Sequence, residues 1–273
     1  MFFWTMLALS AASGIFAIIW YARHDRPVWR SMGITVTRWT PLDIPVGLVI
    51  PFVAITLVFL AELALGAIEV AGADTDWSSI GGVLGEIAGF ALFEEVVFRV
   101  LLLSGAIILL RKVPAGRWIA VAATALIFGA IHLTNENATL IGAFGTALGG
   151  VIYGVAFVAT RSIWLPLFLH ISWNLSQALW GFPVSGNTQW PGWLTSESIG
   201  NELLNGGAYG PEGGIPGMLS RVLIVALVLV YVKLIWRDGS AATLVYAPDP
   251  VRRDRSPAAG NEHATAPSPS HTP

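Results

Sequence analysis

Residues 87–110 read IAGFALFEEVVFRVLLLSGAIILL, an apolar run that carries Glu94, Glu95 and Arg99 near its centre. About 20 apolar residues suffice to cross the hydrocarbon core of a bilayer, so this run is long enough. A charged group inside such a span costs several kcal/mol unless it is paired or faces a cavity. The stretch therefore predicts both a transmembrane helix and a functional site within it.

The composition of the whole chain agrees with this interpretation. Its 273 residues are 55% hydrophobic and only 12% charged, with a mean hydropathy of +0.67, whereas a soluble domain has about 25% charged residues. The formal net charge is −2, and no basic patch indicates a nucleic-acid partner. The absence of cysteine excludes disulfides, thiolate nucleophiles and Cys-type zinc sites. We expect an all-α, polytopic transmembrane helical bundle whose partner is the lipid bilayer.

Seven apolar runs are predicted to cross the membrane. They are residues 1–21, 44–70, 82–110, 118–133, 140–159, 163–182 and 218–236. The connections on one side carry most of the Lys and Arg residues, and those on the other side carry none. The positive-inside rule then places the N-terminus outside and the C-terminus in the cytoplasm.

The same pattern divides the chain into four parts. Residues 1–80 hold two N-terminal spans and a basic loop, and residues 81–182 hold a core of four spans. Residues 183–237 hold a long loop, suited to a lid, and the last span. Residues 238–273 are rich in Pro, Ala, Ser and Thr, a composition that predicts a disordered cytoplasmic tail.

Glu94 and Glu95 have different expected partners although they are adjacent. Glu95 and Arg99 are four residues apart with the acid first, the favourable order for an ion pair on one helix face. Glu94 points about 100° away from Glu95 in an α-helix. One carboxylate is then neutralised locally while the other is available for chemistry. The alternative is a purely structural buried ion pair.

Two further spans carry polar groups at helical spacing. Phe128 and His132 share a face near the end of the fourth span, and His170 and Asn174 share a face on the sixth. Each pair alone has a plain explanation, because polar side chains often hydrogen bond between helices in a membrane bundle. Two carboxylates, two histidines and an amide on three spans instead favour one shared site.

Small residues recur every four positions on two spans. Gly81, Gly85 and Gly89 lead into the acidic pair. On the fifth span, Gly145 is followed four residues later by Gly149, and Gly150 by Gly154. Such spacing lets helix backbones approach closely, so both stripes are predicted to be packing faces.

Together, the motifs EExxxR at 94–99, FxxxH at 128–132 and HxxxN at 170–174 resemble the three ordered motifs of the CPBP family. This family contains the CAAX prenyl endopeptidases and the bacterial Abi proteins linked to bacteriocin processing and self-immunity. The resemblance covers roughly residues 80–182. It implies an intramembrane metalloprotease or hydrolase with its site buried between spans, in a multi-pass protein of a bacterial cell membrane.

The resemblance also assigns roles to individual residues. Glu94 and His132 would activate a water, and His170 and Asn174 would stabilise the oxyanion. Arg99, Glu95 and Phe128 would support them. Glu94, His132 and His170 could also hold Zn²⁺ or another divalent metal, since carboxylate and imidazole are zinc ligands. The residues leave metal-activated and carboxylate-activated water as alternatives.

Three functions from different classes remain open on the sequence. The first is an endopeptidase that cuts a membrane-associated peptide or protein, prenylated or not. The second is a non-catalytic immunity or interaction protein that binds peptide in the same pocket. The third is a transporter or proton relay built on the intramembrane charges.

Overall fold

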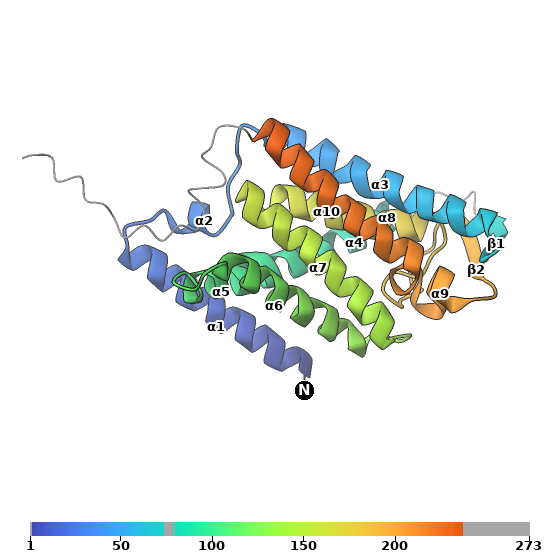
Figure 1. Ribbon diagram of the computed structural model, residues 1–273, viewed down its shortest axis with the longest axis horizontal. Helices are drawn as coiled ribbons and strands as arrows, with labels where there is room; N and C mark the ends of the chain where they lie inside the picture. The colour runs from blue at the N-terminus through green and yellow to red at the C-terminus, as the bar shows by residue number, and fades with distance from the viewer. Residues whose placement is uncertain (1, 74–77, 79, 237–273) are drawn as a thin grey trace, which may run out of the picture.

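The computed structural model describes residues 2–73, 78 and 80–236, and the predicted tail at 238–273 lies outside this range. The described chain is a bundle of helices with one small sheet at an end (Figure 1). Its elements in chain order are α1 (Phe2–Arg23), α2 (Val28–Ser31), α3 (Thr40–Ala64), β1 (Ile68–Ala73), α4 (Ile80–Glu95), η2 (Val96–Leu103), α5 (Ser104–Leu109), α6 (Gly116–Ile131), η3 (His132–Thr134), α7 (Leu140–Thr160), α8 (Trp164–Leu179), β2 (Leu194–Ser198), α9 (Glu202–Asn205), η4 (Gly207–Tyr209), η5 (Pro211–Gly213) and α10 (Ile215–Ile235).

The expected helical membrane bundle is confirmed. Five helices of the described chain are long and apolar enough to span a bilayer: Phe3–Arg23, Thr40–Ala64, Gly116–Thr134, Leu140–Thr160 and Ile215–Ile235. The other two predicted spans correspond to the consecutive helices α4, η2 and α5 and to the shorter helix α8.

Helix α7 lies at the centre of the bundle. It packs against α6, α8 and α10, while α3 packs on α8 and α10, and α1 packs on η2 and α5. Most residues of α7 are buried, whereas α1 and α10 expose many apolar side chains. Because lipid covers exposed apolar side chains in a membrane protein, this arrangement puts lipid around the outer helices and the polar motifs inside.

The third predicted span is not a uniform α-helix. Residues Val96–Leu103 form a π-helical segment between α4 and α5. The Ser104 hydroxyl donates to the carbonyl of Arg99, 3.3 Å away. Wider π-helical turns are rare and occur often at functional sites. Here the wider turns begin directly after the acidic pair.

The second predicted span ends earlier than expected. We predict a span over residues 44–70, but α3 ends at Ala64 and the chain then enters strand β1. Strand β1 pairs antiparallel with β2, with Ile68 opposite Ser198. The apolar composition of residues 65–70 does not distinguish a helix end from a short strand, so the prediction is wrong at this boundary.

The two glycine stripes behave differently. On α7, a Cβ on Gly150 would lie 2.8 Å from the Cα of Ala125, and one on Gly154 would lie 2.9 Å from Val121 Cγ1. This stripe therefore lets α6 approach closely, as predicted. On α4, a Cβ on Gly81, Gly85 or Gly89 would meet no atom within 4 Å. The prediction that this stripe is a packing face is wrong within the described bundle.

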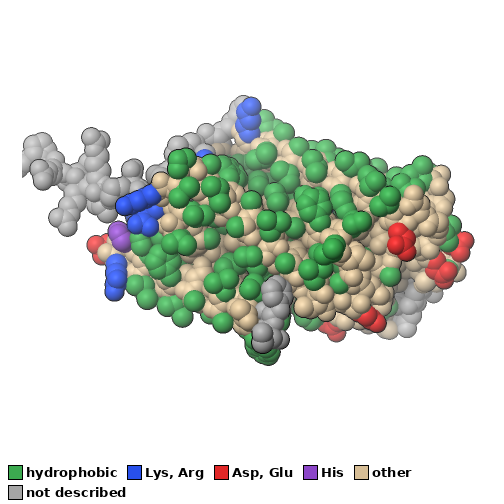
Figure 2. Space-filling model, turned by 60° about the horizontal axis from the view of Figure 1, so that its bottom comes forward, with side chains coloured by type: hydrophobic (Ala, Val, Ile, Leu, Met, Phe, Trp, Pro, Cys, Tyr) green, Lys and Arg blue, Asp and Glu red, His purple; other side chains and the backbone are tan. Residues whose placement is uncertain are grey.

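Charged side chains separate toward the two ends of the molecule. Figure 2 shows Lys and Arg toward one end, most acidic side chains toward the other, and a largely apolar surface between them. The basic end includes Arg23 at the end of α1 and Lys233 in the last turn of α10. The acidic end includes Glu197 on β2 and Glu202 on α9.

Candidate active site

Glu94 lies at the end of α4 and faces two histidines from other helices. Its side chain is 23% exposed. Its Oε2 atom is 3.4 Å from Nε2 of His170, and its Oε1 atom is 3.7 Å from Nε2 of His132. The predicted convergence of three spans on this carboxylate is therefore confirmed. All three side chains are within reach of one bridging water.

His132 is oriented by the helix that carries it. It follows the last residue of α6, and its Nδ1 atom lies 2.7 Å from the carbonyl oxygen of Phe128. A carbonyl only accepts, so Nδ1 carries the proton in this hydrogen bond. A neutral His132 then presents the Nε2 lone pair to Glu94. The four-residue spacing of Phe128 and His132 makes this bond possible.

His170 is oriented by the second carboxylate of the acidic pair. Its Nδ1 atom lies 2.9 Å from Oε1 of Glu95, and the Glu95 side chain is fully buried. The Nδ1 proton is donated to Glu95, which leaves Nε2 to face Glu94. Adjacent carboxylates thus contact the two nitrogens of one imidazole. This link from Glu95 to His170 was not predicted.

Arg99 forms the predicted ion pair with Glu95. Its NH1 atom is 3.3 Å from Oε1 of Glu95, and both side chains are buried. Its NH2 atom also donates to the carbonyl of Gly150, 3.5 Å away on α7. The guanidinium carbon lies 4.6 Å from the ring centroid of Phe128. The chain from Arg99 through Glu95 to His170 holds the imidazole from behind.

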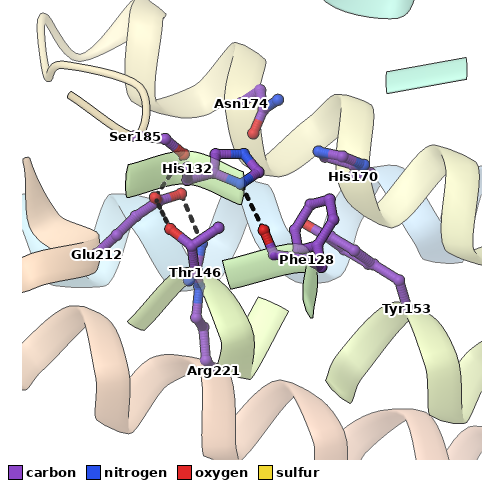
Figure 3. Close-up of a pocket in the computed structure, with 9 residues that line it drawn as sticks. All are labelled: Phe128, His132, Thr146, Tyr153, His170, Asn174, Ser185, Glu212 and Arg221. Carbon is purple, nitrogen blue, oxygen red and sulfur yellow. Dashed lines mark hydrogen bonds and ion pairs between the residues drawn. The ribbon is translucent and has the colours of Figure 1, made fainter. Parts of the chain in front are cut away.

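A small cavity lies beside the two histidines, which both line it. It has a volume of about 20 Å³, enough for a water molecule. Figure 3 shows His170, Phe128 and Tyr153 on one side of it, Asn174 above, and Thr146, Ser185, Glu212 and Arg221 on the other side. Asn174 follows His170 by one turn of α8 and lines the same cavity, as its spacing predicts.

The sequence interpretation missed the second polar group of this cavity. Glu212, in η5, forms an ion pair of 2.5 Å with Arg221 of α10. Its carboxylate also accepts hydrogen bonds from Trp173 at 2.8 Å, Thr146 at 2.8 Å and Ser185 at 2.6 Å. Burial raises the pKa of Glu212, but Arg221 and these donors outweigh burial and hold its pKa below the usual range.

Glu212 fastens the long loop over the cavity. Its four partners come from α7, α8, α10 and the loop itself, so one carboxylate ties residues 183–214 to three helices. Two sequence signals could have indicated this pair. Arg221 is a basic residue near the start of the apolar span 218–236, and Glu212 lies nine residues before it, in a loop without Lys or Arg.

Three other acidic residues of α3, β1 and α4 do not line this cavity. Glu86, on α4, accepts a hydrogen bond from Trp190 Nε1 at 3.0 Å and is exposed. Glu69 is exposed on β1. Glu62 is fully buried on α3, and neither of its carboxylate oxygens has a hydrogen-bond partner in the described chain.

Carboxylate and imidazole, the groups at Glu94 and the two histidines, are donor types found in zinc sites. Each histidine also has its Nδ1 atom fixed by an acceptor and its Nε2 atom directed toward Glu94, as in zinc-bound histidines. Their arrangement is not that of a metal site. Within residues 2–73, 78 and 80–236, no three His, Asp or Glu side chains group closely enough to hold a metal ion. The side chains as placed do not fit a resident metal.

Comparison with known proteins agrees with the motifs. No curated protein and no solved structure matches the chain. Residues 76–176 match the family model described as Rce1-like, type II CAAX prenyl endopeptidase. The matched range contains His132, His170 and Asn174, which line the cavity, and Glu94, which faces both histidines. This part of the chain is therefore similar to the Rce1-like domain of the type II CAAX prenyl endopeptidases.

Proposed function

We propose that the protein is an intramembrane endopeptidase that hydrolyses a peptide bond with a water activated by Glu94. One observation carries this proposal: the Glu94 carboxylate faces the Nε2 atoms of His170 and His132 at 3.4 and 3.7 Å. A partly exposed carboxylate that faces two histidines of a water-sized cavity is suited to act as a general base. The Rce1-like match supports peptide hydrolysis as the reaction.

The reaction proceeds by direct attack of water. Glu94 takes one proton from the water while the water oxygen bonds to the carbonyl carbon of the substrate. Asn174 donates to the resulting oxyanion, as does His170 when both of its nitrogens carry protons. Glu94 then gives its proton to the leaving amine as the C–N bond breaks. His132 accepts a hydrogen bond from the water through Nε2 and holds it for attack.

The proposed substrate is a peptide or protein at the membrane, with a prenyl group as its anchor. The side chains flanking Glu94 on α4 support this assignment, because Phe90 is 53% exposed and Phe93 is 45% exposed on the outer surface of the bundle. Lipid covers such side chains in a membrane, so a substrate held in lipid passes close to Glu94. The Rce1-like match supports the prenyl group.

The proposed membrane orientation has the N-terminus outside and the C-terminus in the cytoplasm of a bacterial cell. Its support is the gathering of Lys and Arg toward one end of the bundle in Figure 2. Basic residues favour the cytoplasmic side of a membrane. This end holds the connection after α5, with Arg111 and Lys112, and the last turn of α10.

The proposal is tested with purified protein and a panel of prenylated and unmodified peptides. We expect Glu94→Gln, which keeps the side-chain shape but removes the base, to lower kcat by at least about 100-fold. The matched control is Glu86→Gln, on an exposed position of the same helix. It should cleave at the wild-type rate.

Two other outcomes favour the alternative functions. In the first, Glu94→Gln and the wild type cleave equally or not at all, yet Glu94→Gln still binds peptide and keeps its effect in cells. The protein is then an interaction or immunity protein. Ion or solute flux in proteoliposomes that depends on Glu94 would instead favour a transporter. Either result would overturn the peptidase proposal.

A further inference from the structure

Tyr153 of α7 contacts the catalytic histidine, although no sequence motif includes it. Its ring stacks on the imidazole of His170, with centroids 4.4 Å apart and planes at 16°. It lines the cavity and is almost fully buried. Near-parallel rings at this distance restrain each other, because tilting either ring loses the contact.

The same ring contacts the ion pair that holds His170 from behind. The guanidinium carbon of Arg99 lies 5.1 Å from the Tyr153 centroid. A guanidinium over an aromatic face is attracted to it by a cation–π interaction, which is stronger when water is excluded. Tyr153 therefore contacts both ends of the chain that runs from Arg99 through Glu95 to His170.

Three neighbours restrain the His170 imidazole. Glu95 accepts from Nδ1, Tyr153 covers one face, and the ring of Phe128 lies 5.9 Å away, edge-on at 81°. The Nε2 atom faces Glu94. A rotation of the imidazole about its χ2 angle would break the Glu95 bond and the Tyr153 stack together.

Helix α7 holds Tyr153 in place through the glycines around it. Gly150 and Gly154 lie three residues before and one residue after it, and their missing side chains bring α7 against α6. The Tyr153 ring is thereby set at a fixed depth between the helices that carry Phe128 and His170. Figure 3 shows it reaching from α7 toward these two side chains.

We propose that Tyr153 is a positioning residue for the hydrolytic reaction: its ring keeps the His170 imidazole turned so that Nε2 faces Glu94. This inference rests on the proposed peptidase function. The ring performs this role through stacking, so the hydroxyl is not required for it. Small misplacements of catalytic groups are costly, and an error of about 1 Å can lower a rate by about 100-fold.

The test compares Tyr153→Leu with Tyr153→Phe in the full-length protein. Tyr153→Leu removes the stack and should lower kcat by about 10–100-fold with less than about a 2-fold change in KM. Tyr153→Phe keeps the ring and should restore most of the rate. The matched control is Tyr231→Leu on α10, another buried tyrosine, whose hydroxyl bonds to Asp43 at 2.7 Å, far along the chain from the motifs. It should lower stability and leave kcat unchanged.

A second measurement reports on His170 without any substrate. In ¹⁵N-histidine-labelled protein, the His170 signals, assigned with His170→Gln, should show a single form in which Nδ1 is protonated. Tyr153→Leu should give averaged tautomers, whereas Tyr153→Phe and Tyr231→Leu should keep the single form. If these NMR changes occur but the wild type cleaves no peptide, the peptidase proposal is wrong, while the role of Tyr153 in orienting the His170 imidazole is supported.

The positioning role itself has clear contrary outcomes. Tyr153→Leu with wild-type kcat, or with the single His170 tautomer intact, overturns it. Equal losses of kcat in Tyr153→Leu and Tyr153→Phe also overturn it, because they would assign the effect to the hydroxyl.

Discussion

Glu95 and His170 are joined by a buried hydrogen bond of 2.9 Å, and the Glu95 oxygen in this bond is the one that faces Arg99 at 3.3 Å. One oxygen atom therefore neutralises a guanidinium and orients an imidazole. A structural role for the Glu95–Arg99 ion pair therefore does not exclude a functional role for it at this site.

Glu95→Gln should separate these two effects. The amide keeps the shape but leaves Arg99 as a buried, unpaired charge, which we expect to destabilise the protein by about 3–5 kcal/mol. Adding Arg99→Met should recover much of this stability, since the unpaired charge is removed. Activity should stay low, because the neutral amide oxygen accepts the Nδ1 hydrogen bond of His170 more weakly than the carboxylate does. Unfolding and cleavage are both measured in detergent. Recovery of activity together with stability would refute a role for Glu95 in orienting His170.

The cap over the cavity should respond to acid through Glu212. The folded protein holds the pKa of Glu212 below its ordinary value of 4.5, so the stabilisation is present above about pH 4.5 and is lost as the pH falls through the folded-state value. Glu212→Gln should remove this part of the acid response. At neutral pH it should also destabilise the protein by about 3–5 kcal/mol, because Arg221 then lacks its partner.

The measurement for Glu212 is the Tm between pH 3 and 7 for the wild type, Glu212→Gln and Glu202→Gln. Glu202 is a suitable control because it is exposed on α9. Identical acid profiles for the wild type and Glu212→Gln would show that other groups dominate the response.

Metal removal should leave the proposed reaction intact. Since the described histidines and carboxylates form no group of three arranged around an ion, we expect chelator-treated protein to keep its kcat within about 2-fold. Elemental analysis of the wild type, His132→Ala and His170→Ala should show equal metal contents. Stoichiometric zinc in the wild type that disappears in both variants, together with loss of activity in chelator, would assign the water to a metal instead.

The two glycine stripes allow a matched pair of substitutions. Gly85→Ala should keep or raise Tm, because its Cβ meets no atom within 4 Å and alanine favours a helix by about 1 kcal/mol. Gly150→Ala should lower Tm, because its Cβ would lie 2.8 Å from the Cα of Ala125. A loss of stability in Gly85→Ala would indicate that another surface covers α4.

Sequence reasoning predicted the contacts that depend on one helix. The four-residue spacing of Glu95 and Arg99, and of Phe128 and His132, places each pair on one face whatever the rest of the chain does. The contact of Glu95 with His170 depends instead on how α4 and α8 are rotated about their axes. Apolar composition does not determine that rotation, so only the convergence of the motifs was predictable.

The long loop was the least predictable part of the candidate site. Residues 183–216 have no strong periodic pattern, and their Gly and Pro content indicates only irregular structure. In the structure they contain β2, α9, η4 and η5, and they bring Glu212 into the cavity. The buried position of Glu212 comes from partners on three separate helices, which no local pattern encodes.

The π-helical segment after Glu95 restricts how this chain can change in length. Its wider turns let α4 direct Glu94 and Glu95 toward the histidines while α5, further along, still packs on α1. Deleting one residue between Val96 and Leu103 would remove a wide turn and change how the acidic pair is aimed relative to α5. Insertions and deletions should therefore be accepted in the connections between helices, while this segment keeps a constant residue count.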